Sequence, residues 1–370
     1  MSRLQKAESM ERCNISAVGI LDNLRTSEKA LNPRHKVLLK ILGKCNPSLC
    51  LDQIFFFPEA KYQALQKHYG SREYARLDFE YQHKESASIF MENAADIILL
   101  CGSYLRDLKL KFTESVGFSD HMIDSIRHIK NLKKLIIEGA RDPCIVNDSQ
   151  SLAEVLSSVI SLESLSLKFA SLEVMCLDAG CLPNLVHFWI FNHPNNYNAI
   201  INFISTEGRK IKVLECMPML IGDESIKLFE VLKESLEGIF VSGIPDDIRE
   251  DLRLVEFSNL RFIQIRYMDD LYDFPTWLEW PIFKNVELFI MNYKDSRNYW
   301  KETLIGLRKT KIITPPNLKH FVFITGRKNH EKDTSFVNGF KRHGISCHFK
   351  SNLEYTEALE ILATLKNQEY

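Results

Sequence analysis

The stretch Asn131-Leu-Lys-Lys-Leu-Ile-Ile137 contains the phrase that decides the fold. Its pattern is a leucine, two variable residues, a second apolar residue, one variable residue and a third apolar residue. The phrase recurs along the chain with Leu, Ile or Val at its first position. Its copies open at Leu105, Leu132, Leu162, Leu185, Ile211, Leu236, Leu260, Val286 and Leu318. A weaker first copy opens at Leu77, and a degenerate last copy follows Gly344.

These phrases recur at regular intervals and therefore form a repeat. Successive copies from Leu77 begin 23 to 32 residues apart, and several carry an asparagine just before the opening residue (Asn131, Asn184, Asn259, Asn285 and Asn317). The pattern resembles leucine-rich repeats, in which each copy supplies one strand of a curved parallel sheet. We therefore expect an α/β solenoid of about ten repeats. One internal column is expected to contain Leu108, Leu135, Leu165, Phe188, Leu214, Ile239, Ile263 and Phe321.

The segments between the phrases have helical periodicity. Leu152, Val155, Leu156, Val159 and Ile160 form one apolar stripe at helical spacing. Ser119 is a predicted helix N-cap, with Phe118 and Ile123 at the positions of a hydrophobic staple. Asp223 similarly precedes the apolar positions Ile226, Phe229 and Leu232. Strands and helices that alternate in this way bury their apolar sides by stacking on neighbouring repeats.

A doubly wound nucleotide-binding fold also alternates strands and helices. That fold needs a glycine-rich turn between its first strand and helix, and the sequence contains neither GxGxxG nor GxxxxGK[ST]. The repeat is therefore favoured over the doubly wound fold.

Residues 33–70 break the repeat and predict three short helices. The first has an apolar stripe within Val37 to Leu42, the second covers Leu49 to Phe56, and the third starts near Pro58. This layout resembles a degenerate F-box, an all-α module that docks substrate receptors onto the Skp-type adaptor of a cullin-RING ubiquitin ligase. The resemblance implies adaptor contacts at eight positions: Pro33, Leu38, Leu39, Ile41, Leu42, Leu51, Phe57 and Tyr62.

The match departs from the F-box pattern at two places. Asn32-Pro33-Arg34-His35 replaces the usual Leu-Pro-x-Glu opening, and Phe57 to Tyr62 replaces a Val-Cys-x-x-Trp-like run. An alternative is that this segment is a helical cap on the apolar end of the solenoid. In either case the predicted organisation is an N-terminal tail over 1–32, the helical module over 33–70 and the solenoid over 71–370.

The resemblance implies a non-catalytic substrate-recognition subunit of a Skp–cullin–F-box ubiquitin ligase, with a Skp-type adaptor, a cullin scaffold and a target protein as partners. The alternatives are a leucine-rich-repeat scaffold or inhibitor without a ligase link, and an enzyme on an unrecognised α/β fold.

The concave strand surface is the predicted place for target binding. Strand residues alternate between two faces, so those between the apolar positions of each phrase point into the hollow. In the middle repeats these residues are aromatic, large or cationic, a composition typical of interface hot spots. The predicted patch consists of His187, Trp189, Phe191, Val213, Met217, Phe240, Phe262 and Arg266, with Trp189 as its anchor.

The remaining features of the sequence predict neither a catalytic or metal site nor a membrane-spanning segment. The nine cysteines form no Cys-x-x-Cys pair, no pair of His320, His330, His343 and His348 has zinc-site spacing, and the pairs Asp246-Asp247 and Asp269-Asp270 suit turns. We expect no cofactor, no metal, no catalytic residue and no enzymatic activity. A net charge of −1 argues against general nucleic-acid binding, and the apolar runs are too short to span a bilayer. The expected location is the cytoplasm, the nucleus or both.

Charge is nevertheless unevenly distributed. By count, residues 308–350 contain ten Lys or Arg against two Asp or Glu, whereas residues 223–300 contain nine against sixteen. Such blocks are typical of solvated faces and, less commonly, of surfaces that steer a partner.

Overall fold

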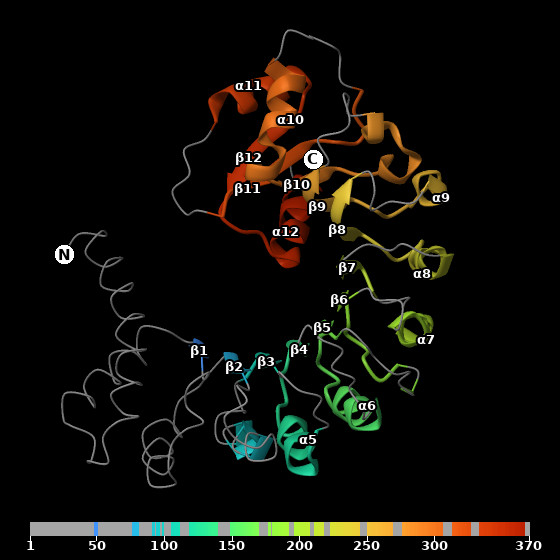
Figure 1. Ribbon diagram of the computed structural model, residues 1–370, viewed down its shortest axis with the longest axis vertical. Coiled ribbons are helices and arrows are strands. Elements are labelled where there is room, and N and C mark those ends of the chain that lie inside the picture. Colours follow the sequence, from blue (N-terminus) through green and yellow to red (C-terminus); the bar gives the residue numbers. More distant parts are fainter. Residues whose placement is uncertain are drawn as a thin grey trace, which may run out of the picture. The chain divides into compact units, whose positions relative to one another are not determined.

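The computed structural model describes residues 48–50, 76–80, 91–92, 94–96, 98–99, 105–111, 118–139, 149–169, 177–178, 180–191, 196–207, 211–217, 223–244, 250–268, 276–305, 313–326 and 333–366. The chain forms two compact units, residues 1–162 and 163–370. Both are parallel α/β arrays of repeating strand–helix units (Figure 1). None of the helices in the described ranges is long and apolar enough to cross a bilayer.

Unit 1 contains a parallel sheet in the order β1-β2-β3-β4. Its strands are β1 (Ser48–Cys50), β2 (Arg76–Glu80), β3 (Asp107–Lys111) and β4 (Lys134–Glu138), and its helices include α5 (Asp120–Arg127) and α6 (Ser149–Ser158). Leu77, which opens the weak first copy, pairs with Leu108, and Leu108 pairs with Leu135. These three side chains are buried, which confirms the first copy and the predicted column within this unit.

Strand β1 corrects one prediction. The second helix of the F-box-like module was expected to begin at Leu49, but Ser48–Cys50 is a strand in which Leu49 pairs with Leu77. The sheet therefore extends into the segment assigned to the module. The eight predicted adaptor contacts, from Pro33 to Tyr62, lie outside the described residues.

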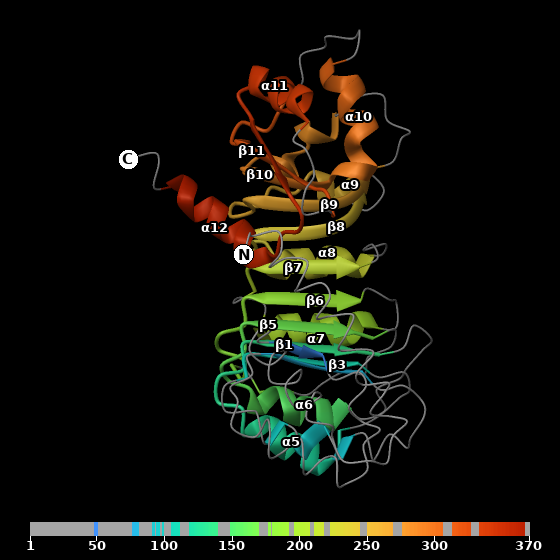
Figure 2. The ribbon, with the colours of Figure 1, turned by 90° about the vertical axis from the view of Figure 1, so that its left-hand side faces the viewer.

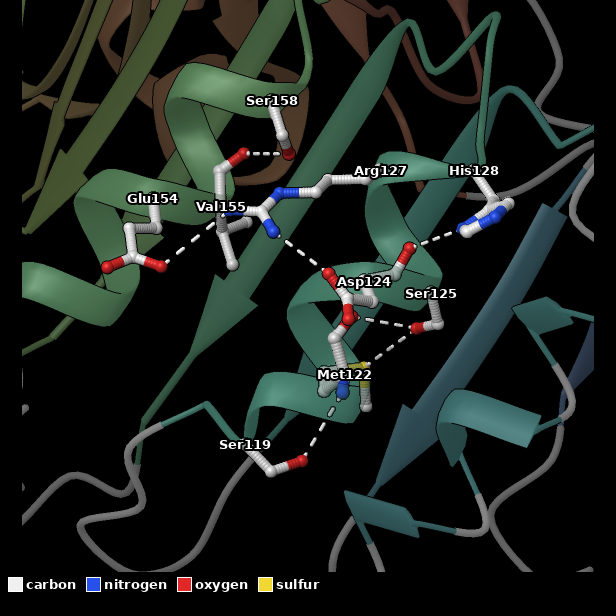
Figure 3. Close-up of polar contacts among 9 residues, drawn as sticks. All are labelled: Ser119, Met122, Asp124, Ser125, Arg127, His128, Glu154, Val155 and Ser158. Atoms are coloured by element: carbon white, nitrogen blue, oxygen red, sulfur yellow. Dashed lines mark hydrogen bonds and ion pairs between the residues drawn. The ribbon is translucent and has the colours of Figure 1, made fainter.

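Helices α5 and α6 follow the predicted signals closely (Figure 3). Ser119 caps α5 by accepting a hydrogen bond from the Met122 amide, at 3.3 Å, and the staple residues Phe118 and Ile123 are buried. Arg127, in the last turn of α5, reaches Asp124 at 2.8 Å and Glu154 of α6 at 3.7 Å. These two ion pairs are exposed, so each adds well under about 1 kcal/mol to stability.

The predicted apolar stripe of α6 is confirmed except at its last residue. Leu152, Val155, Leu156 and Val159 are buried, but Ile160 is 63% exposed. Helix α6 ends at Ser158, so the helical periodicity that would turn Ile160 inward is lost before that residue.

Unit 2 contains the strands in the order β5 to β12, each parallel to the next (Figures 1 and 2). The strands are β5 (Ser164–Lys168), β6 (His187–Phe191), β7 (Val213–Met217), β8 (Gly238–Ile244), β9 (Phe262–Met268), β10 (Leu288–Asn292), β11 (His320–Ile324) and β12 (Ser346–Lys350). The helices are α7 (Tyr197–Glu207), α8 (Asp223–Leu232), α9 (Glu250–Arg253), the 3-10 turns η5 (Thr276–Glu279) and η6 (Pro281–Phe283), α10 (Tyr293–Ile305), α11 (Thr334–Arg342) and α12 (Tyr355–Lys366).

A buried column runs through unit 2 on the face of the sheet that we call face B. Leu165, Phe188, Leu214, Ile239, Ile263, Phe289 and Phe321 are each paired with the next and are at most 2% exposed. Trp300 of α10 and Phe340 of α11 pack on Phe321, with ring centroids 5.0 and 4.5 Å apart. The predicted column is therefore confirmed within this unit, where Phe289 is an additional member.

Backbone hydrogen bonds join each repeat to the previous one in a constant pattern. The carbonyl of Glu163 accepts both the Val186 and His187 amides at 3.0 Å, and the carbonyls just before β6, β7, β8, β9 and β10 each accept two amides in the same way. Three of the recurring asparagines add to this ladder. Asn259, Asn285 and Asn317 donate their side-chain amides to backbone carbonyls of the preceding repeat at 2.6, 2.9 and 3.4 Å.

The degenerate last copy is a real strand. Gly344 has a φ of +75° after α11, a conformation that favours glycine, and it leads directly into β12, where Cys347 pairs with Phe321.

Identical substitutions on and off the column test this arrangement. Leu214→Ala should lower the free energy of unfolding by about 2 to 5 kcal/mol, because it leaves a cavity at a fully buried position. Leu254→Ala is the control, since Leu254 is 74% exposed, and should change stability by less than about 0.5 kcal/mol. Denaturant unfolding measures both, and equal losses would contradict the assigned register.

Candidate functional site

Face A is the side of the unit 2 sheet opposite to face B. Along each strand it contains the residues between the column positions, such as Val213 and Glu215 of β7 or Phe262, Gln264 and Arg266 of β9. The predicted patch has this alternation, since all of its members lie on face A. The structure differs from the prediction in what covers them.

The C-terminal helix α12 packs on face A. Its buried residues Leu353 (just before the helix), Ala358 and Leu362 form one apolar cluster with the strands. The strand members of this cluster are Val213, Phe240, Phe262, Leu288, Ile290 and Val322. Figure 1 shows α12 on the side of the sheet opposite α7, α8 and α9, and Figure 2 shows it at the end of the sheet where the strands begin.

Gly238 makes part of this packing possible. A Cβ on Gly238 would lie 2.0 Å from the ring of Phe262, so only glycine lets that ring lie flat across β8. The Phe262 ring in turn meets Phe240 edge to face, with centroids 5.8 Å apart. The sequence pattern placed both rings on face A but did not identify this close approach.

Burial by α12 corrects the expectation of an open aromatic patch. Val213, Phe240 and Phe262 are at most 5% exposed. His187 is 4% exposed: its ring stacks on Tyr355 of α12, with centroids 4.2 Å apart and an interplanar angle of 9°. The Met217 side chain, also predicted for the patch, lies outside the described part of the structure.

His187 is the polar centre of this contact. Its Nδ1 lies 2.8 Å from the Ser164 hydroxyl, and its Nε2 lies 3.4 Å from a carboxylate oxygen of Glu215. The Nε2 atom has no hydrogen-bond partner among the described residues, so its contact with Glu215 is a close approach of the two groups and not a hydrogen bond. The other carboxylate oxygen of Glu215 lies 3.5 Å from Arg266, whose side chain is 52% exposed.

The part of face A toward the strand ends is less covered. We call it the strand-end strip and define it as Lys168, Trp189, Phe191, Glu215, Gln264 and Arg266. Trp189 is 9% exposed, and the Lys168 ammonium lies 4.9 Å from the centre of its ring. Phe191, Lys168 and Gln264 are half-buried, and the side-chain carbonyl oxygen of Gln264 has no hydrogen-bond partner among the described residues.

Sequence reasoning missed the apolar residues of face A in β10 and β11. The runs Leu288-Phe-Ile-Met and Phe321-Val-Phe-Ile are continuously apolar, which is the signature of strands buried on both faces. The amphipathic C-terminal segment supplies the cover, since Tyr355, Ala358, Leu359 and Leu362 recur at helical spacing. Those two signals together predict a helix on face A.

The unit 1 sheet has a charged, half-exposed side opposite to its own buried column. On this side Arg76 and Asp78 form an ion pair at 2.9 Å, and Lys109 and Glu138 form another at 3.3 Å. No described strand residue on this side of the unit 1 sheet is aromatic.

Chemistry-bearing groups are sparse in the described part of the chain. Within those ranges, no group of three or more His, Cys, Asp or Glu is placed to hold a metal ion. Burial raises the pKa of the Cys347 thiol to about 12, which makes it a poor nucleophile at neutral pH. Asp246-Asp247, Asp269-Asp270 and His330 lie outside the described residues.

No protein-family model matches the chain, and no curated protein matches it. The resemblance to F-box and leucine-rich-repeat proteins therefore remains a prediction from the residues themselves.

Trp189→Ala tests the burial of the strand-end strip. Truncation of a tryptophan this buried should cost roughly 3 to 5 kcal/mol of unfolding free energy and lower the melting temperature. Arg266→Ala, at an exposed position on the same face, is the control and should leave the melting temperature within a degree or two. An unchanged melting temperature for Trp189→Ala would instead place the ring in solvent.

A pH effect is expected from the stacked pair His320 and His348 on β11 and β12, whose ring nitrogens lie 3.0 Å apart. Burial, followed by the charges of His348 and Lys319, lowers the pKa of His320 below 6.5. The folded state thus binds this proton less readily than the unfolded state, so stability is full above pH 6.5 and falls as the pH drops below it.

His320→Gln should therefore flatten the decline of the melting temperature between neutral and mildly acidic pH. Titration of the His320 ring by NMR checks the cause directly. A midpoint at or above 6.5 in the folded protein would contradict it.

Proposed function

We propose that the chain is the non-catalytic substrate-recognition subunit of a cullin-RING (Skp–cullin–F-box) ubiquitin ligase, built on a leucine-rich-repeat solenoid. The N-terminal module holds the Skp-type adaptor, and face A holds the target protein, in the cytoplasm or the nucleus. The chain contributes proximity: it raises the concentration of the target near the ligase and carries out no bond chemistry itself.

One observation carries the protein-binding part of this proposal. The strand-end strip places Trp189, Phe191 and Arg266 on one face of a hydrogen-bonded sheet. Aromatic rings beside a guanidinium favour binding to a protein surface. The ligase part rests on the F-box-like sequence of residues 33–70 alone.

A scaffold or inhibitor without a ligase link is the second candidate. Strand β1 favours it, because Leu49 extends the sheet within the segment assigned to the F-box-like module. A segment that continues the sheet in this way suits a cap on the end of the solenoid.

Co-purification with a Skp-type adaptor separates the two candidates. The wild-type chain should retain the adaptor, and the double variant Leu38→Asp with Leu42→Asp should lose it, because burying an unpaired carboxylate costs several kcal/mol. The control is Leu254→Asp, the same change at a residue that is 74% exposed, which should still bind. Failure of the folded wild-type chain to bind the adaptor would leave only the scaffold.

A further inference from the structure

We propose that face A over β7–β11 is a helix-binding groove, that α12 occupies it in cis, and that the target protein presents an amphipathic, acidic helix that takes the place of α12. This inference rests on the proposed function for the existence of a target, and it goes beyond that function by naming what the target must look like.

The contacts of α12 are those of a helix docked in a groove. Tyr355, Ala358, Leu359 and Leu362 occupy the positions i, i+3, i+4 and i+7, and all four are buried or half-buried against face A. This spacing is the anchor pattern of amphipathic helices that bind apolar grooves in other proteins. The strand side of the groove is preformed, because its residues are members of a hydrogen-bonded sheet.

Exchange of one helix for another avoids the main cost of opening the groove. Removal of α12 alone would expose Phe240, Phe262, Leu288, Ile290 and Val322, which no globular protein does readily. A second helix with the same spacing covers the same side chains, so the apolar area buried before and after exchange is similar. The competing advantage of α12 is its high effective concentration, which follows from its short connection to β12 over residues 351–354.

The charges at the start of α12 indicate which net charge a helix that replaces α12 should have. Glu354, Glu357 and Glu360 lie at or near the start of α12, and Lys350 at the end of β12 lies beside them. Lys350 and Glu357 form an ion pair of 3.6 Å across this junction. A helix that competes with α12 is therefore expected to be acidic on its polar side, with binding that weakens as salt rises.

The test is the binding of a fluorescent peptide with the sequence of residues 351–366 to the full chain. Ala358→Asp places a carboxylate at a fully buried position of α12 and should release the helix, so this variant should bind the peptide about tenfold or more tightly than the wild type. Ala363→Asp is the matched control, because Ala363 is an exposed residue of the same helix. Its peptide binding should equal that of the wild type.

An effect on helix stability alone would give the opposite order of the two variants from the one that the proposal predicts. A carboxylate in the later turns of a helix is less favourable than one near its start, so helix stability alone would make Ala363→Asp the more disruptive change. Tighter peptide binding by Ala358→Asp only would therefore come from burial. Equal binding by the two variants, or none by Ala358→Asp while β9–β11 retain hydrogen-exchange protection, would overturn the groove.

Two further measurements make the test independent of folding and of the ligase. Leu362→Ala is a milder release variant and should bind the peptide more tightly than wild type even if Ala358→Asp does not fold. An acidic peptide of unrelated sequence with apolar residues at i, i+3, i+4 and i+7 should compete, and its scrambled form should not. Competition by both peptides would overturn the helix specificity, and dimers joined through exchanged α12 helices would assign the groove to a second copy of the chain.

Adaptor binding plays no part in these measurements. If the chain exchanges α12 but does not bind the adaptor, the groove proposal is supported and the ligase proposal is contradicted. If the chain binds the adaptor but does not exchange α12, the ligase proposal is supported and the groove proposal is contradicted.

Discussion

Each unit depends on one constraint, the burial of a column of apolar side chains on one face of its own sheet, which is face B in unit 2. Because side chains alternate along a strand, a shift of one residue would move every column residue to face A and every face A residue to the helices. Leu214 and Phe321 are fully buried, and the residue on either side of each points to the opposite face. In unit 2, the carbonyls just before β5 to β10 each accept two amides of the next repeat, which holds that register from one repeat to the next.

The same constraint explains why α12 lies where it does. With the column directed to face B, Phe262, Leu288, Ile290 and Val322 must point to face A. A sheet face with this composition cannot remain in water at low cost, and the chain covers it with its own C-terminal helix. Further toward β5 and β6, face A instead bears Ser164, Ser166 and Lys168 beside Trp189. Face A thus comprises the groove that α12 covers and the strand-end strip, which extends from Lys168 of β5 to Arg266 of β9.

The two parts of face A suit different kinds of contact. The groove is apolar and is filled by α12, whereas the strand-end strip combines aromatic rings with the Glu215–Arg266 pair. His187 lies between them: its ring stacks on Tyr355 of α12 and faces Glu215 of the strip.

The amino-acid sequence by itself determined the repeat, the column and the caps, because these depend on local periodicity and on residues close together in the chain. Leu108, Ser119 and the strand after Gly344 follow from such patterns. It could not determine the exposure of Trp189 and Phe240, or the strand at Leu49, since both depend on contacts between segments far apart in sequence. The tertiary structure decided them: α12 returns to face A from the far end of the chain, and burial is a property of the assembled layers, which a two-residue alternation does not contain.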